Sequence, residues 1–291
     1  MNTSADKICT LSFDIEEWFQ VENLKRAITR YDWKAKKSSV VKNTDLILEI
    51  LDKHNIYATF FILGWVAERH PALIREIKQR GYEIASHGYS HKRIYTQTTE
   101  QFREETRRSK NLLEDIIGQP ILGYRAASYS ITAKSLWALD ILIEAGFSYD
   151  SSIFPIRHDL YGLPNARRFS HLVERESGSI YEYPLSTIRI GGMNVPVGGG
   201  GYLRLFPYTL TKWAIGKLNK IDHQPAVVYV HPWELDPGQP RLNGKRLSRF
   251  RHYVNLHKTE GVLKSLLADF RFGAFSDLNK ECIASVVGQG E

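Results

Sequence analysis

The sequence predicts an α/β fold built on a parallel β-sheet. In the first half of the chain, short apolar segments of strand type alternate with longer segments in which apolar residues recur at helical spacing. Such alternation is typical of βα units, where each helix carries the chain back so that the next strand runs parallel to the last. Gly81, Gly118 and Gly146 directly follow three of the helical segments, as expected where a helix ends.

The predicted strands are short runs of mainly apolar residues. The first runs into three carboxylates, and the third is followed by two histidines. Strands are predicted at 8–13, 58–63, 82–86, 122–125, a short segment that reaches Asp150, 181–184, 187–190 and 226–230.

The predicted helices carry separate signals. The segment 44–54 has four apolar residues at helical spacing, and the segment 71–80 begins with a proline suited to a first turn. The segment 99–117 opens on Thr-Thr-Glu and stops at a glycine that precedes a proline. Two further helices are predicted at 134–145 and 207–220.

Beyond Ser152 the alternation loosens into loops rich in proline and glycine. The four glycines at 198–201 do not form a phosphate-binding loop, because no Lys-Ser/Thr follows them and no G-x-G-x-x-G pattern is completed. They are expected to permit close backbone approach in a loop near the site. No repeat or clear linker divides the chain, so a single domain over residues 1–291 is expected.

The composition excludes several classes of protein. With 43% hydrophobic and 24% charged residues, the chain is neither disordered nor membrane-like. No apolar run approaches the roughly 18 residues of a membrane span. The first residues lack the basic start and apolar stretch of a secretory signal, and Cys9 and Cys282 give no disulfide framework. A cytoplasmic protein is therefore expected.

The net charge of +7 favours acidic partners. The densest basic stretches, 34–37 and 241–251, lie in no recognisable nucleic-acid-binding motif, so no nucleic acid partner is expected. A phosphorylated glycan carrier or an anionic membrane surface fits the charge, and 241–251 is the better candidate for such a contact. A solvated basic face is the alternative.

A pair of histidines follows the strand at 82–86. His87 and His91 lie four residues apart beside Gly88. Imidazole is the commonest protein ligand for zinc and suits other late first-row metals, but a catalytic ion needs a further protein ligand and a water. The sequence therefore predicts a metal site that takes a third ligand from elsewhere.

Three carboxylates crowd the end of the first strand, at Asp14, Glu16 and Glu17. Burying an ionised carboxylate without a partner costs roughly several kcal/mol. Such a cluster is therefore either solvated or neutralised by a cation. Strand alternation sends Asp14 and Glu16 to one side and Glu17 to the other. Asp14 and Glu16 are therefore the pair expected to act in the site. The alternative is that these carboxylates lie at a solvent-exposed strand end without a function.

Polar residues recur at the carboxyl ends of the predicted strands. In parallel α/β folds this edge of the sheet carries the active site. The residues that lie at or just after such ends are Asp14, Glu16, His87, Arg125, Asp150 and His231.

These residues stand in segments whose order resembles the five motifs of polysaccharide deacetylases, the NodB-type domain of carbohydrate esterase family 4. The segments are Ser12-Phe13-Asp14, His87 to His91, Tyr124-Arg125-Ala126-Ala127, Asp150-Ser151-Ser152 and Tyr229-Val230-His231. The resemblance covers about 8–237 and implies a distorted (β/α)7 barrel-like fold. The longer signatures are similar to those of deacetylases found with exopolysaccharide and exosortase gene clusters, which implies a C-terminal extension at about 155–280.

The resemblance also implies a role for each site residue. His87, His91 and a carboxylate would hold a divalent metal, usually Zn²⁺, with Co²⁺, Ni²⁺ or Mn²⁺ as alternatives. Most members have two adjacent aspartates in the first motif, but Ile15 follows Asp14 here, so Glu16 would be the ligand, with Glu17 as the alternative.

By the same resemblance, the other motif residues carry the proton transfers. Asp14 would be the general base, oriented by Arg125. His231 would be the general acid, supported by Asp150. Nearby aromatic residues such as Trp18 and Trp233 could stack on sugar rings, although core packing explains aromatic residues equally well.

The expected activity is metal-dependent removal of N-acetyl groups from glycan units, polymeric or lipid-linked, during exopolysaccharide assembly. A close alternative is a deformylase or an allantoinase-like amidohydrolase acting on a smaller C–N amide. A catalytically inactive glycan-binding relative is the alternative from another class.

Overall fold

The computed structural model describes residues 8–242 and 245–278 of the chain. Its centre is a sheet in which β1 lies between β10 and β2, and the remaining strands continue outward from β2. All neighbours pair in parallel except the edge hairpin of β7 and β6, and β11 pairs with the start of β1. In sheet order the strands are β10 Val227–Val230, β1 Cys9–Ile15, β2 Thr59–Ile62, β3 Glu83–Ser86, β4 Gly123–Tyr124, β5 Tyr149–Asp150, β7 Gly178–Glu182 and β6 His171–Arg175, with β11 at Phe272–Gly273. The predicted α/β fold is confirmed.

The register of the strands aligns their carboxyl ends. One row of paired residues crosses the sheet through Ile15, Ile62, Ser86, Tyr124 and Asp150. The residue that follows each member of this row is therefore placed along a single edge of the sheet. Three of these following residues are Glu16, His87 and Arg125.

Backbone hydrogen bonds beyond the regular strands bring the far side of the sheet back to β10, which makes the fold barrel-like. The hairpin of β8 (Thr187–Ile190) and β9 (Met193–Pro196) lies at this seam. Val197 N donates to the carbonyl of Ser186 over 3.1 Å, and Tyr229 N donates to the carbonyl of Gly198 over 2.8 Å. A Cβ added at Gly199 would lie 2.3 Å from the ring of Tyr229, so this approach requires glycine, as the sequence predicted.

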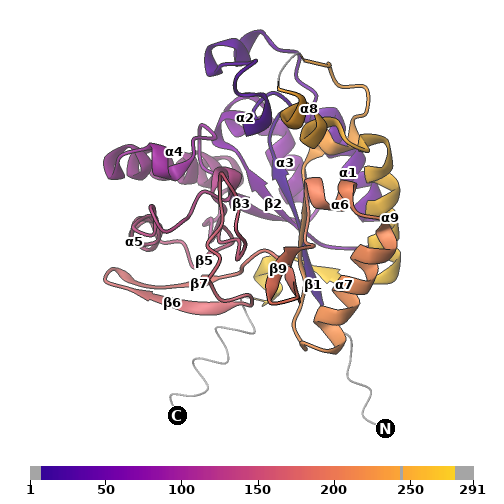
Figure 1. The fold of residues 1–291 in the computed structure, drawn as a ribbon. Coiled ribbons are helices and arrows are strands. Elements are labelled where there is room, and N and C mark those ends of the chain that lie inside the picture. Colours follow the sequence, from indigo (N-terminus) through magenta and orange to yellow (C-terminus); the bar gives the residue numbers. More distant parts are fainter. Residues whose placement is uncertain (1–7, 243–244, 279–291) are drawn as a thin grey trace.

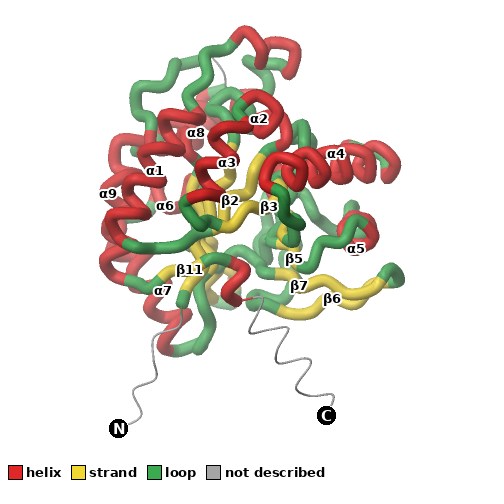
Figure 2. Tube along the Cα trace, turned by 180° about the vertical axis from the view of Figure 1, so that it is seen from behind, coloured by secondary structure: helices red, strands yellow, loops and turns green. Residues whose placement is uncertain are grey.

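Helices lie outside the strands. Figures 1 and 2, seen from opposite sides, show α1, α7 and α9 along one side of the strands and α4 and α5 along the other. The helices are α1 Val40–His54, α2 Gly64–Arg69, α3 Pro71–Gln79, α4 Thr99–Ile117, α5 Ala138–Glu144, α6 Gly201–Leu205, α7 Tyr208–Lys220, α8 Arg246–Tyr253 and α9 Thr259–Asp269. Among the described residues, no helix has both the length and the apolar character needed to cross a membrane.

Local signals in the sequence explain where several helices begin and end. The Thr98 side chain accepts a hydrogen bond from Gln101 N, and the Gln101 side chain accepts one from Thr98 N, which forms the capping box at the start of α4. Gly118 ends α4 in the left-handed conformation with φ of 68°. The helix predicted at 134–145 is shorter than expected, because turns occupy the segment up to Trp137.

Candidate active site

Two histidines and a glutamate converge at the carboxyl edge of the sheet. Glu16 follows β1, His87 follows β3, and His91 comes from the loop after His87, where Gly88 and His91 have positive φ angles of 71° and 52°. One potential ligand atom from each of Glu16, His87 and His91 lies within 4.8 Å of the other two. Three protein donors of this type leave a position open for water or substrate on a catalytic zinc ion.

The donor atoms of this cluster are free to bind a metal. Glu16 Oε2 is buried without a hydrogen-bond partner, although His91 Nε2 lies 2.6 Å away, while Glu16 Oε1 accepts a hydrogen bond from Trp233 Nε1 over 3.1 Å. His87 Nδ1 lies 2.9 Å from the carbonyl of Arg125, so this nitrogen donates and Nε2 keeps its lone pair. The residues present therefore fit a divalent ion.

The protonation states of the cluster agree with metal binding. Burial lowers the pKa of His87 to about 4, so its imidazole is neutral. Burial alone would raise the pKa of Glu16, but the adjacent His91 outweighs that effect and lowers it below its usual range. A neutral imidazole and a carboxylate are the forms that bind metals.

Asp14 lies beside the cluster in a buried ion pair. Its Oδ1 is 2.7 Å from Arg125 Nη1, and its Oδ2 accepts a hydrogen bond from the Tyr129 hydroxyl over 3.2 Å. Burial alone would raise the pKa of Asp14, but the Arg125 guanidinium outweighs it and lowers the pKa. Arg125 also donates to Ser12 Oγ over 2.8 Å. Asp14 is thus held as a carboxylate in a fixed orientation.

His231 follows β10 and lies close to both Glu16 and Asp14. Its Nε2 lies 3.6 Å from Glu16 Oε1 and 3.9 Å from Asp14 Oδ2. Its Nδ1 lies 2.6 Å from Oε1 of Glu234, which belongs to the 3-10 helix η5, Pro232–Leu235. Burial alone would lower the pKa of His231, but its contact with Glu234 outweighs this effect and raises the pKa to about 9.

A second buried cation supports Glu234. Arg204 Nε lies 2.6 Å from Glu234 Oε2, and Arg204 Nη1 donates to the carbonyls of His252 and Val254. Burial alone would raise the pKa of Glu234, but Arg204 outweighs it and lowers the pKa to about 2. Glu234 is therefore a carboxylate that orients His231 and fixes which nitrogen faces the cluster.

The expected contact between Asp150 and His231 is wrong, because Glu234 occupies the position of the supporting carboxylate. Asp150 instead accepts a hydrogen bond from Ser152 Oγ over 2.5 Å and pairs across β5 and β7 with Glu182. Both carboxyl groups are fully buried, and burial raises the pKa of Asp150 to about 6 and that of Glu182 well above its usual value. We expect the two groups to share one proton at neutral pH.

Of the two alternatives Glu16 and Glu17, Glu16 belongs to the cluster of possible metal ligands among the described residues and Glu17 does not. Glu17 points to the start of α1, where its Oε2 accepts a hydrogen bond from Ser39 N over 3.0 Å. Burial raises the pKa of Glu17. It therefore serves as an acceptor for the amino end of a helix.

A cavity of about 360 Å³ opens over the site. Its floor includes Asp14, Glu16, His91 and His231, and its walls carry the aromatic residues Tyr129, Tyr161, Tyr202, Tyr229 and Trp233. Trp18 is buried among other aromatic residues and does not line this cavity, so its predicted role in sugar stacking is wrong. Trp233 is also buried, with its ring stacked between His231 and His252.

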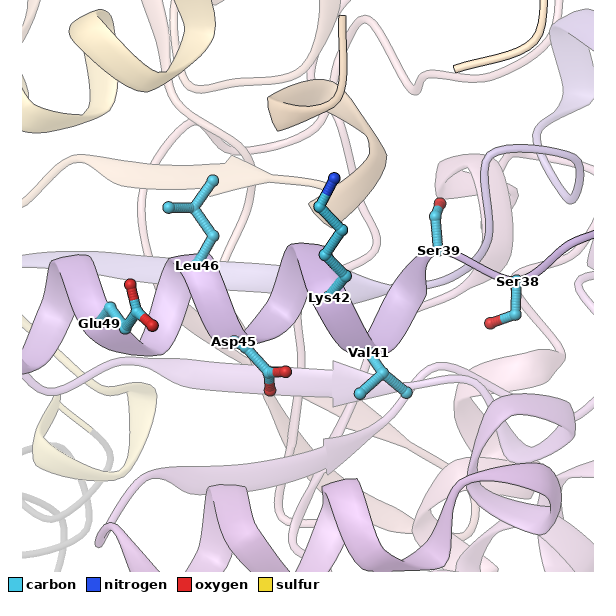
Figure 3. Close-up of a pocket in the computed structure, with 7 residues that line it drawn as sticks. All are labelled: Ser38, Ser39, Val41, Lys42, Asp45, Leu46 and Glu49. Carbon is cyan, nitrogen blue, oxygen red and sulfur yellow. The ribbon is translucent and has the colours of Figure 1, made fainter. Parts of the chain in front are cut away.

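A larger surface hollow of about 560 Å³ lies along α1 and differs in kind. Figure 3 shows five of its side chains on successive turns of α1 and two, Ser38 and Ser39, on the segment just before it, without convergence on a point. The residues that line it are Ser38, Ser39, Val41, Lys42, Asp45, Leu46 and Glu49. No histidine is among them, so the hollow is not the candidate active site.

Glu234, Arg204 and Tyr129 are site residues to which sequence reasoning gave no role in catalysis. The signal for Glu234 is local: it stands three residues after His231, where a carboxylate can reach back to that residue's backbone N–H. Arg204 carries no comparable signal, because its partner lies thirty residues further along the chain.

The fold and site together define an α/β barrel-like protein with a candidate Glu-His-His metal centre, flanked by a buried Asp–Arg pair and a Glu-supported histidine. Residues 3–147 match the polysaccharide deacetylase family, and residues 151–280 match a domain of unknown function, DUF3473. The chain belongs to the polysaccharide deacetylase family and carries DUF3473 as its C-terminal part.

Individual relatives agree with this assignment. A peptidoglycan-N-acetylglucosamine deacetylase of Bacillus cereus is 33% identical over 75 residues, which are 26% of this chain and 27% of that protein. The match thus spans about a quarter of the curated relative.

Solved structures share the fold. A structure from Mycobacterium smegmatis whose name places it with the polysaccharide deacetylases has a TM-score of 0.61 at 21% identity, over 98% of this chain and 93% of that one. An allantoinase structure has a TM-score of 0.59 at 14% identity, over 93% of this chain and 88% of that one. At these identities the likeness shows the fold alone.

Proposed function

We propose that this protein is a metal-dependent N-deacetylase that hydrolyses N-acetyl groups on amino-sugar units of a polysaccharide or a lipid-linked glycan, in exopolysaccharide biosynthesis. The observation that carries the proposal is that Asp14 and His231, whose Oδ2 and Nε2 lie 3.9 Å apart, line one cavity beside the Glu16, His87 and His91 cluster. The Bacillus cereus relative is named a peptidoglycan-N-acetylglucosamine deacetylase, which supports the reaction type.

Amide hydrolysis needs an activated water, a stabilised carbonyl oxygen and a proton for the departing amine. A divalent ion bound by Glu16, His87 and His91, such as Zn²⁺, would lower the pKa of water from 15.7 to about 7 and polarise the carbonyl. Asp14 is the residue placed to accept the water proton, because Arg125 and Tyr129 hold its carboxylate beside the cluster.

His231 is placed to donate a proton to the leaving amine. Glu234 holds Nδ1, and Nε2 lies 3.6 Å from Glu16 Oε1, whereas His91 lies next to Glu16 Oε2. Base and acid therefore stand on different elements, β1 and the end of β10, and both reach a substrate that enters from the cavity. A group transfer of this kind forms a C–O bond and breaks the C–N bond, releasing acetate and a free amine.

The test of the proposal is acid release from a panel of amides. Metal-free protein is reconstituted separately with Zn²⁺, Co²⁺, Ni²⁺ or Mn²⁺ and incubated with N-acetylglucosamine oligomers, N-formylated sugars and allantoin. Acetate release from the oligomers supports the proposal. Turnover of the formylated sugars or of allantoin alone would assign the allantoinase-like or deformylase alternative, and no turnover of any compound would favour an inactive glycan-binding relative.

A pair of adjacent variants tests the metal ligand set. Glu16→Gln is expected to lose bound metal, because it removes one of three protein donors, whereas Glu17→Gln is expected to keep it, because Glu17 faces the start of α1. Metal content is measured by mass spectrometry after dialysis. Equal retention in the two variants would reject the proposed cluster.

A further inference from the structure

Two segments with many basic residues contribute to the rim of the active-site cavity. They are 20–39, which follows β1, and 236–253, of which the structure describes 236–242 and 245–253 and which contains α8. Figure 1 shows α8 next to the indigo segment that follows β1, and α8 packs against the 3-10 helix η1, Glu22–Leu24. Side chains of both segments line the cavity, among them Glu22, Phe250 and Arg251.

These two segments hold eleven lysines and arginines against three aspartates and glutamates, an excess of eight. The whole chain has a net charge of +7, so the remainder of the protein is close to neutral. On α8 and just before it, Lys245, Arg246 and Arg249 are exposed, and in the described part of the chain no ion pair is formed by them. These three cations on and just before α8 are therefore available to a partner.

Apolar side chains project from the same rim. On α8, Leu247 and Phe250 are 60% and 52% exposed. They lie three residues apart, so they share one face of the helix. Leu205, which is 46% exposed, lines the cavity beside Phe250. An apolar ridge set among unpaired cations is the pattern of a helix that lies in the interface of an anionic bilayer.

We propose that the α8 rim docks this protein on an anionic lipid bilayer, with Leu247 and Phe250 inserted among the acyl chains and Lys245, Arg246 and Arg249 on the lipid headgroups. An anionic glycan would also satisfy the cations, but it offers no apolar environment to a leucine that is 60% exposed. Docked in this way, the cavity opens at the membrane surface, where a glycan carried by a lipid is presented. The proposal concerns the surface alone and does not require the deacetylase reaction.

Vesicle co-sedimentation of the full chain tests the proposal. The probes are phosphatidylcholine vesicles with and without phosphatidylglycerol. We expect preferential binding to the anionic vesicles that falls as salt is raised. Each basic residue near such a surface contributes roughly fivefold, so Arg246→Gln with Arg249→Gln is expected to weaken partitioning about 30-fold. Leu247→Ser with Phe250→Ser is expected to weaken it about tenfold or more.

Matched controls come from the opposite end of the barrel. Lys53 and Lys220 are exposed at the last turns of α1 and α7, where helices of βα units end near the amino edge of the sheet. Lys53→Gln with Lys220→Gln removes the same charge and is expected to change partitioning about twofold at most. Trp213 and Ile221, which are 51% and 67% exposed at α7, provide the apolar control as a Trp213→Ser, Ile221→Ser double variant.

Each outcome decides the proposal. Loss of anionic-vesicle binding in both α8 variants, with both controls binding and all variants melting like the parent protein, supports it. Equal binding to neutral vesicles, or an equal loss in the Lys53 and Lys220 variant, overturns it. Absence of vesicle binding together with Arg246-dependent binding of a soluble anionic polysaccharide also overturns it and assigns the rim to a glycan. Acetate release is measured separately, so failure of the deacetylase assay leaves this test intact.

Discussion

The Asp14–Arg125 pair is expected to be a unit of stability as well as a part of the site. The Arg125 side chain is fully buried, and the Asp14 side chain is only 2% exposed. The guanidinium makes four hydrogen bonds, to Asp14 Oδ1, Ser12 Oγ, and the hydroxyl and carbonyl oxygens of Ser151. Removing one partner of such a pair leaves an uncompensated buried charge.

The perturbation is a double-mutant cycle of Arg125→Met and Asp14→Asn. Breaking a buried pair from one side costs about 3–5 kcal/mol, while replacing both charges with neutral groups of similar volume is often close to neutral. We expect about 4 kcal/mol of lost stability for Arg125→Met and about 3 kcal/mol for Asp14→Asn, whose amide oxygen still accepts a hydrogen bond. The double variant is expected to lose about 3 kcal/mol rather than the sum, a coupling of about 4 kcal/mol.

The assay is urea unfolding of the metal-free proteins followed by far-ultraviolet circular dichroism. The matched control is Arg175→Met, which breaks a partly exposed pair with Asp140 at 2.6 Å and is expected to cost about 0–1 kcal/mol. In the metal-loaded proteins, Asp14→Asn is expected to lower kcat/KM by about 10²–10⁴-fold and to keep its metal. Strict additivity in the cycle, or unchanged turnover in Asp14→Asn, would refute the reasoning.

Three further predictions concern the residues around the site. Trp233→Phe removes the donor to Glu16 Oε1 and is expected to weaken metal binding about 10–100-fold in a chelator competition; unchanged affinity would argue against that contact. Burial raises the pKa of Asp150 to about 6 and that of Glu182 further, so the pair's contribution to stability is present at acidic pH and lost as pH rises through these values. Glu182→Gln, which mimics the protonated acid, is expected to unfold within about 1 kcal/mol of the parent protein at pH 7, whereas Glu182→Ala is expected to lose about 3 kcal/mol; equal losses would reject a shared proton. Burial lowers the pKa of His252 from 6.5 to about 3, so its contribution to stability is present above pH 6.5 and is lost as pH falls towards 3. The parent protein is expected to lose about 2 kcal/mol more than His252→Gln between pH 8 and pH 5, and parallel pH profiles would contradict this assignment.

Much of the site's position could be predicted from the sequence because the strands are parallel. The rule that polar residues gather at the carboxyl ends of such strands places Asp14, His87, Arg125 and His231 together without any knowledge of side-chain geometry. Strand alternation likewise separates Glu16 from Glu17, and the structure shows them pointing to the metal cluster and to α1 respectively. Local periodicity is sufficient for these conclusions.

The pairing of carboxylates could not be predicted in this way, because it depends on strand order. Asp150 meets Glu182 only since β5 lies next to β7, further along the chain. Glu182 follows Asp150 by 32 positions, and Glu234 follows Arg204 by 30. The family resemblance predicted that Asp150 supports His231. In the structure, Glu234 of η5 contacts His231 instead. The sequence did not predict helix α8. This helix is polar and has too few apolar residues to give a periodic signal.

The two regions matched by different family models build one site, and the contacts of Glu16 show why neither is sufficient. Its Oε2 faces His91, from the region 3–147, while its Oε1 is held by the indole N–H of Trp233, from the region 151–280. Strand β10, from the second region, pairs along β1, from the first, and thereby sets the distance between Asp14 and His231. The DUF3473 region therefore provides the acid side of the proposed reaction, the supporting Glu234–Arg204 pair and the α8 part of the charged rim. Variation within that region would alter where the enzyme works and what it accepts, while the metal ligands in the first region stay the same.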